Sequence, residues 1–261
     1  MGSAECYAFL ERSKHETMKE HISGMLKRLR ERWEYYAALQ KYEKLLGVER
    51  DVLNSLIKLA IILHDVGKSK REYQERCIEN CTSFPYHYAI SARVAMQFTN
   101  LTGVKVPLID ELSSKPSYRP SLGVLYLSVV VLPILLHHYA QVTEESLIRA
   151  IRATKNINEI EIYEPCREIY METLYTLLKY LKRPQSELTD MLEKAYEVLS
   201  ESSKIKLATL PLINEYSLLK IYAKVSPLLT LVEVFTGILN ICDGLVACVN
   251  REERFGLRKC G

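Results

Sequence analysis

The feature that most constrains this chain is an apolar segment that ends on a histidine and an aspartate. Residues 56–63 are all apolar except Lys58, and His64 and Asp65 follow directly. A helix that is apolar on nearly every face is buried inside a globule. A lone carboxylate at the end of such a helix is costly unless it is paired or bound to a cation. The segment therefore predicts a buried central helix that ends in either a hydrogen-bonded His-Asp pair or a metal site.

Three flanking residues extend this prediction. Asp51 is expected to cap the start of the helix, and Gly67 is expected to stop it. Lys68 follows His64 by about one turn, so we expect its ammonium to share a pocket with whatever His64 and Asp65 hold. A metal-bound anion would suit such a pocket.

The rest of the chain reads as successive helices. Residues 14–46 carry apolar side chains at a period near 3.6, which predicts one long amphipathic helix that ends at Gly47. Further helices are predicted over residues 72–80, 86–98, 122–139 and 184–200, from Thr143, from Pro165, and on either side of Pro227. Residues 101–121 contain three prolines and predict the one long loop. We find no strand alternation that predicts a sheet and no internal repeat. The prediction is an all-α fold with a single domain over residues 1–261.

Composition excludes several classes of protein. With 48% hydrophobic and 26% charged residues, the sequence is typical of a soluble globular protein, and a net charge of +3 is too mild to indicate nucleic-acid binding on its own. The N-terminus shows no apolar core after basic residues, so we expect a cytoplasmic protein without a signal peptide. Residues 122–136 are too short for a membrane span and residues 225–249 contain Glu233 and Asp243, so no membrane is expected.

The seven cysteines form no paired Cys-x-x-Cys motifs. Cys77 and Cys81 stand about one helical turn apart, which allows a redox pair or half of a zinc site, but no second cysteine pair or free histidine completes the zinc site. Buried or surface thiols are therefore expected. Disulfides would instead suit the cytosol of a hyperthermophile.

The histidines favour a metal site over a simple His-Asp pair. Five of the six fall inside predicted helices: His21, His64, His87, His137 and His138. The adjacent pair His137 and His138 ends an apolar run and is hard to explain as packing, whereas His21 alone would be a surface or packing histidine. Ser91, one turn after His87, is expected to orient its ring or its ligand. Asp243 lies in an otherwise apolar helix and needs a partner, which a cation held by histidines would supply.

This ordered set of residues resembles the HD superfamily of metal-dependent phosphohydrolases. The set is His21, His64-Asp65, His87, His137-His138 and Asp243, and it covers the chain from its first predicted helix to its last. The spacing His64-Asp65-x-Gly67-Lys68, the His87-x-x-x-Ser91 pair and the doubled His137-His138 are most similar to the stand-alone HD nuclease of type I CRISPR interference. The resemblance implies an HD-domain helical bundle whose central buried helix carries the His-Asp pair.

The same resemblance implies partners. The substrate would be single-stranded nucleic acid, and a separate CRISPR helicase subunit and a crRNA-guided surveillance complex would act with this chain. Gly67-Lys68-Ser69 mimics the end of a P-loop, but Ile62 stands where the first glycine of that loop would be. We therefore expect no motor in this chain.

Two divalent metal ions are also implied by the resemblance. His21, His64, Asp65 and Asp243 would hold the first ion, and Asp65, His87, His137 and His138 would hold the second, so that Asp65 bridges them. Mixed imidazole and carboxylate ligands favour manganese, iron, nickel or cobalt, with zinc and magnesium as alternatives. Two ions about 3.5 to 4 Å apart can activate a water for in-line attack on a phosphodiester. Asp65 and Lys68 are the expected catalytic residues, and Lys68 would offset charge on the scissile phosphate.

The sequence says less about the substrate. Arg149, Arg152 and Lys155 could track a phosphate backbone, as could the basic residues of segment 27–32, although spaced cations on a helix are usually a solvated face. Tyr86, Tyr88 and Tyr139 flank the proposed ligands, and they could stack on unpaired bases or serve the core.

Three functions therefore stay open. The first is a nuclease that acts on single-stranded DNA and also on RNA. The second is an HD phosphohydrolase or phosphodiesterase for small nucleotides, which needs a closed pocket for base and sugar. The third is a binding subunit with a structural metal, although seven ligands exceed the usual four.

Overall fold

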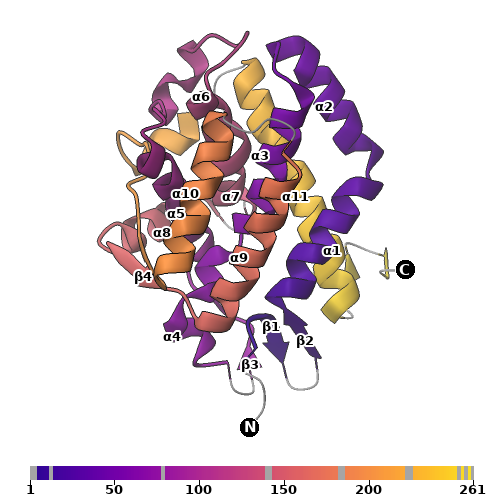
Figure 1. Cartoon of the computed structure of the whole chain (residues 1–261), viewed down its shortest axis with the longest axis vertical. Coiled ribbons are helices and arrows are strands. Elements are labelled where there is room, and N and C mark those ends of the chain that lie inside the picture. Colours follow the sequence, from indigo (N-terminus) through magenta and orange to yellow (C-terminus); the bar gives the residue numbers. More distant parts are fainter. Residues whose placement is uncertain are drawn as a thin grey trace.

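The computed structural model describes residues 5–11, 14–77, 80–138, 143–181, 186–220, 226–251, 254–255 and 258–259. Helix accounts for 69% and strand for 8%, so the prediction of a mainly helical chain is confirmed. In Figure 1 the helices form a bundle, and a small sheet lies at one end of it beside the start of the first helix.

The helices, in chain order, are α1 (Met18–Glu31), α2 (Trp33–Leu46), α3 (Arg50–Leu63), α4 (Arg71–Gln74), α5 (His87–Thr102), α6 (Leu122–Tyr126), α7 (Leu132–Leu136), α8 (Glu144–Thr154), α9 (Glu164–Lys179), α10 (Glu187–Glu201) and α11 (Pro227–Arg251). A π-helical turn, Leu127–Val131, joins α6 to α7, and 3-10 turns span Val66–Ser69, Ile109–Ser114 and Glu215–Lys220. The strands are β1 (Tyr7–Glu11), β2 (Lys14–Thr17), β3 (Asn80–Cys81), β4 (Glu159–Glu161), β5 (Lys204–Lys206), β6 (Arg254–Phe255) and β7 (Arg258–Lys259).

The predicted buried helix is α3, and it lies inside the bundle. It contacts α1, α2, α5, α7, α9 and α11, and every residue from Leu59 to Leu63 is at most 1% exposed. Burying this many aliphatic side chains supplies a large favourable free energy, at roughly 25 cal/mol for each Å² of apolar surface. The central position of α3 is therefore confirmed, and its C-terminal end is surrounded by neighbouring helices.

The prediction of one long helix over residues 14–46 is wrong. Residues 14–17 form β2, and Thr17 begins α1 with a capping box in which its side chain accepts from the backbone of Glu20 while the side chain of Glu20 accepts from the backbone of Thr17. Arg32 then adopts an extended conformation and separates α1 from α2. In one continuous helix Arg32 would follow Leu29 on the buried stripe, so the break keeps a cation out of the core.

Other helix boundaries also differ from the predictions. Glu49, and not Asp51, is the N-cap of α3, and Asp51 lies in the first turn, where the helix dipole favours a carboxylate. The helix predicted over residues 72–80 is only the short α4. Thr143 caps α8 as predicted, whereas residues 139 and 184 lie outside the described part of the chain.

The prediction that no sheet forms is wrong for three small antiparallel sheets. One has the strand order β2-β1-β3, a second pairs β4 with β5, and a third pairs β6 with β7. Their strands have two to five residues. Strands of this length are too short for alternation to be recognised in a sequence.

Disulfides replace some of the expected thiols. Cys6 in the segment before β1 is bonded to Cys166 on α9, and Cys77 is bonded to Cys81. The expectation of free thiols is therefore wrong for these four, and the bond between Cys77 and Cys81 leaves neither thiolate free to serve as half of a zinc site. Cys242 on α11 is a buried free thiol.

Helix α11 is long and apolar enough to cross a membrane by length and composition alone. Within the bundle it packs against α1, α2 and α7. It also carries Asp243, whose position is described next.

Candidate metal centre

Five segments that are far apart in the sequence bring the seven predicted ligands together. His21 lies on α1, His64 and Asp65 follow α3, His87 begins α5, His137 and His138 follow α7, and Asp243 lies on α11. The ligand atoms form two groups, each with its atoms within 4.8 Å of one another: His21, His64 and Asp243 in the first, and Asp65, His87, His137 and His138 in the second. Either group could hold a metal ion.

In the first group the imidazoles of two helices face each other. Nε2 of His21 lies 3.1 Å from Nε2 of His64 and 3.4 Å from Oδ1 of Asp243. Oδ2 of Asp65 lies 3.5 Å from Nε2 of His21 and 3.3 Å from Nε2 of His64. Asp65 therefore adds a carboxylate oxygen to this group.

The second group is built around the other oxygen of the same carboxylate. Nε2 of His87 lies 3.0 Å from Nε2 of His138. Oδ1 of Asp65 lies 3.2 Å from Nε2 of His87 and 3.8 Å from Nε2 of His137. Asp65 thus presents Oδ2 to one group and Oδ1 to the other.

The tautomers of three rings follow from their hydrogen bonds. Nδ1 of His64, His87 and His137 lies 2.7, 2.8 and 2.6 Å from the backbone carbonyl oxygen of the residue three positions earlier. A carbonyl oxygen only accepts, so Nδ1 must carry the proton and Nε2 of each neutral ring keeps a lone pair. For His64 and His137 this bond also satisfies a carbonyl at a helix C-terminus, which otherwise has no intrahelical partner.

The Nε2 atoms and the carboxylate oxygens therefore form a buried set of acceptors. Among the described residues, Nε2 of His137 and both oxygens of Asp65 have no hydrogen-bond partner of acceptable geometry. Buried polar atoms are rarely left in this state, because each loses its bonds to water. Acceptor atoms that converge without donors fit a cation, and imidazole with carboxylate is a common donor set for transition metals.

Lys68 supplies part of the missing positive charge. Its Nζ lies 2.6 Å from Oδ2 of Asp65, although not in hydrogen-bond geometry, and 5.6 Å from the centre of the Phe84 ring. Burial raises the pKa of Asp65, but the charges of Lys68 and His64 outweigh burial and hold that pKa well below its usual range. Asp65 is therefore ionised, as a metal ligand must be.

Two imidazoles of the second group, those of His137 and His138, have lowered pKa values. Burial, together with the neighbouring His138 and His64, lowers the pKa of His137 well below its usual value. Burial and His87 lower the pKa of His138 to about 4. In His64, by contrast, burial lowers the pKa but the charge of Asp65 outweighs it, so the net shift is upward. Neutral rings are the form that binds metals.

Gly67 and Ser91 hold the segment after Asp65 against α5. A Cβ atom on Gly67 would lie 2.3 Å from the backbone oxygen of His87, so this close approach requires glycine. The prediction that Gly67 stops α3 is wrong, because α3 ends at Leu63. The expectation that Ser91 orients His87 is also wrong, since its Oγ accepts from the backbone nitrogen of Gly67 at 2.8 Å.

Exposure differs between the ligands. The side chains of His21 and His64 are 0% exposed and that of Asp65 is 2%, whereas those of His87 and Asp243 are 11% and 19% exposed. His87 and Asp243 are therefore the more solvent-accessible of these ligands.

The residues predicted to contact a substrate have mixed surroundings. Nε of Arg152 donates to Glu215 at 2.7 Å, so this cation is already paired, and Arg28 likewise pairs with Glu31. Tyr88 is 6% exposed and packs edge-on against the ring of His87, so it serves the core rather than a stacking surface. Tyr139 lies outside the described residues.

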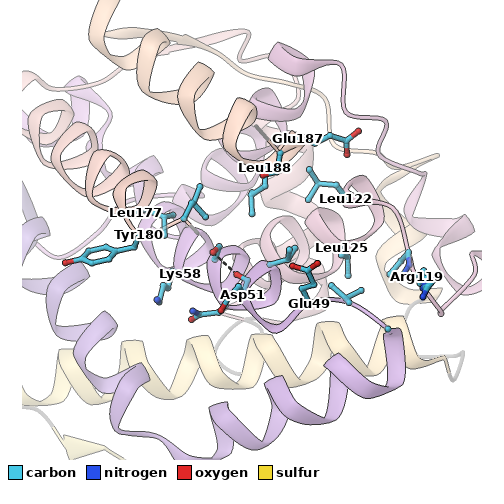
Figure 2. A pocket seen from close by; sticks show the side chains of 18 residues that line it. Glu49, Asp51, Lys58, Arg119, Leu122, Leu125, Leu177, Tyr180, Glu187 and Leu188 are labelled. Atoms are coloured by element: carbon cyan, nitrogen blue, oxygen red, sulfur yellow. Dashed lines mark hydrogen bonds between the residues drawn. The ribbon is translucent and has the colours of Figure 1, made fainter. Parts of the chain in front are cut away.

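A separate cavity of about 840 Å³ lies away from the centre. Figure 2 shows Asp51 and Lys58 of α3 on its wall, together with Leu177 of α9 and Leu188 of α10. Its lining includes none of the seven ligands. No sequence pattern indicates this cavity, because its walls come from four separate segments of the chain.

The sequence also did not indicate a role for Glu16, whose carboxylate contacts the ring of His21 at Nδ1. This residue of β2 is 0% exposed, and its Oε1 lies 2.9 Å from Nδ1 of His21. Residue 16 was expected to lie inside one long helix over residues 14–46. The capping box Thr17-x-x-Glu20 is the signal that could have moved the helix start and placed Glu16 before it.

No known family model matches the chain, and no curated protein is significantly similar to it. The chemistry of the centre therefore rests on its own geometry.

Proposed function

We propose that this chain is an HD-type, metal-dependent nuclease that hydrolyses phosphodiester bonds of single-stranded DNA, and also of RNA, in CRISPR interference. The observation that carries the proposal is the position of Asp65 between two groups of imidazoles, with one oxygen directed to each. Such a carboxylate can be shared by two ions. A pair of ions supports in-line displacement at phosphorus by acting on both the attacking and the leaving oxygen.

The two groups would hold one divalent ion each, in the ligand sets predicted from the sequence. When bound, these ions lower the pKa of a water and stabilise negative charge on a phosphodiester. The Nε2 lone pairs of the histidines and the ionised Asp65 provide the ligand atoms. Manganese, iron, nickel and cobalt suit this mixture of nitrogen and oxygen better than magnesium does.

The protein itself contributes binding and charge. Lys68 lies beside Asp65 with its ammonium buried, and we propose that it offsets charge on the scissile phosphate. The more exposed side chains of His87 and Asp243 mark the side from which a strand would approach. A separate CRISPR helicase subunit, acting with a crRNA-guided surveillance complex, would supply that strand unpaired, and no membrane is involved.

A small-nucleotide hydrolase is the competing function. It would need a closed pocket for base and sugar next to the ligands. The cavity of about 840 Å³ contains none of them, so it does not supply that pocket. Turnover of nucleotides, as against cleavage of single strands, distinguishes the two functions.

The proposal is tested with metal-free protein that is supplied with manganese, nickel or magnesium. Each sample is offered labelled single-stranded DNA, single-stranded RNA, duplex DNA and a panel of nucleotides. We expect cleavage of the single strands with manganese or nickel and little turnover of nucleotides. Selective hydrolysis of nucleotides with intact oligonucleotides would overturn the proposal. Glu233→Gln, at an exposed acid on the same helix as Asp243, is a matched control that should cleave like wild type.

A further inference from the structure

His21 differs from His64, His87 and His137 in the partner of its Nδ1 atom. His64, His87 and His137 each donate to a backbone carbonyl, whereas Nδ1 of His21 lies 2.9 Å from the carboxylate of Glu16. A carboxylate accepts this proton and leaves the lone pair of His21 on Nε2, which faces the first group of ligands. A charged acceptor also makes the ring a stronger ligand than a carbonyl does.

The carboxylate of Glu16 is itself fixed on its far side by the end of α11. Nδ2 of Asn250 donates to Oε1 at 2.9 Å, and Nε of Arg251 donates to Oε2 at 2.8 Å. The guanidinium of Arg251 also lies 4.7 Å from the ring centre of Phe9, which is the strand partner of Glu16. Glu16 thus has ordered donors on both oxygens although it is fully buried.

Side chains on one face of α11 therefore contact the first metal group at two places, directly through Asp243 and indirectly through Glu16. Asp243 and Asn250 are seven residues apart, and Arg251 is eight residues after Asp243, so all three lie on the same face of the helix. Between them, Val246 packs so close to Gly24 of α1 that a Cβ atom on Gly24 would lie 3.1 Å from its methyl groups. Asp243 points at His21 directly, and Asn250 and Arg251 act on it through Glu16.

We propose that Glu16 is a positioning residue for the first metal ion, held in place by Asn250 and Arg251. It fixes the tautomer and the orientation of His21, so that Nε2 is presented to the ion together with His64 and Asp243. This inference rests on the proposed metal site, but it does not depend on the substrate. It extends the site to the last described turn of α11.

Metal binding in the absence of nucleic acid tests the inference. Titrations of metal-free protein with cobalt or manganese are carried out in two backgrounds: His87→Ala, which leaves the first ion, and Asp243→Asn, which leaves the second. We expect Glu16→Gln to lower the affinity for the first ion by about 10- to 100-fold. This is the usual effect of removing the hydrogen-bond acceptor of a metal-binding histidine. The second ion should keep its affinity, and Glu16→Asp should recover part of the loss because the charge is retained.

Two outcomes would overturn the inference. Equal losses of affinity for both ions would mean that Glu16 only stabilises the fold. Unchanged affinity for the first ion would mean that Glu16 does not position His21. Glu172→Gln is the matched control, because Glu172 pairs with Lys19 at the surface of the protein and should leave both affinities unchanged. A wild-type protein that binds two ions yet cleaves no nucleic acid would overturn the proposed function and leave this inference intact.

Discussion

Lys68 folds back onto Asp65, and its Nζ lies 2.6 Å from Oδ2 although the two side chains are only 9% and 2% exposed. The same carboxylate faces the Nε2 atoms of four histidines. The ammonium of Lys68 is therefore the cation closest to Asp65, and the other atoms around this carboxylate are the Nε2 acceptors of the histidines. We therefore expect the stability of the protein to depend on metal binding.

Lys68→Met should destabilise the metal-free protein more than the metal-loaded one. Without the ammonium, the buried carboxylate of Asp65 has lost its nearest cation, which costs about 3 kcal/mol or more of unfolding free energy. Bound manganese would restore positive charge beside Asp65. Thermal melts with and without manganese measure the difference, and Lys70→Met is the control because Lys70 pairs with the exposed Glu72. Equal losses under both conditions would contradict the coupling.

Asp65→Asn should lower the rate of phosphodiester hydrolysis by about a hundredfold or more and reduce the bound ions from two to at most one. The reason is that an amide replaces the one ionised group that faces both sets of imidazoles. Metal content after dialysis and single-turnover cleavage check the two effects. His64→Ala should also abolish cleavage. Retained cleavage in Asp65→Asn would refute the bridging role.

Asp243→Asn and His87→Ala should remove different ions. Asp243 lies 3.4 Å from Nε2 of His21 in the first group, and His87 lies in the second. Each variant is expected to keep one ion and to lose most of its turnover, since hydrolysis needs both. Titration of each variant alone and of the double variant gives the stoichiometry. Two ions of wild-type affinity in Asp243→Asn would exclude Asp243 as a ligand.

Gly67→Ala should weaken the fold and the second metal group together. The added methyl would lie 2.3 Å from the backbone oxygen of His87, which cannot move without shifting the start of α5. Overpacking of this kind costs about 3 kcal/mol. Urea unfolding measures the loss. Gly237→Ala on α11 is the matched control, because nothing lies within 4 Å of its added Cβ and alanine favours a helix by about 0.5–1 kcal/mol.

The sequence predicted the seven ligands but not their support. His64 and Asp65 were recognisable because charge at the end of an apolar helix is costly, and the structure brings the other five residues to them. Glu16 and Arg251 are separated by most of the chain, and no local pattern indicates that they meet. Such a contact depends on how α11 packs against α1, which periodicity alone does not determine.

Helix boundaries were predicted less well than helix identity. The apolar period runs through residues 18–46, but whether Arg32 continues the helix depends on the core that its side chain would enter. The short strands and the bond between Cys6 and Cys166 are likewise set by tertiary packing. Local sequence therefore specifies the elements, and long-range contacts decide where they end.

The disulfides Cys6–Cys166 and Cys77–Cys81 should differ in their contribution to stability. The bond between Cys6 and Cys166 spans 160 residues, and the loop-closure entropy of the unfolded chain gives it about 5 kcal/mol. The bond between Cys77 and Cys81 spans four residues, and the same relation gives about 2 kcal/mol. Cys6→Ala with Cys166→Ala should therefore lower the unfolding free energy more than Cys77→Ala with Cys81→Ala. Urea unfolding of the two double variants under oxidising conditions compares them.

Both pairs must be changed by substitution rather than by reductant, because Cys248 is also disulfide-bonded and would respond to the same reagent. The longer bond joins the segment before β1 to α9, and the backbone oxygen of Cys6 accepts from Met18 at the start of α1. Loss of this bond should therefore loosen the start of α1, which carries His21, and weaken the first ion as well. Unchanged affinity for the first ion in the Cys6 and Cys166 double variant would show that β2 and Glu16 hold His21 in place without the disulfide.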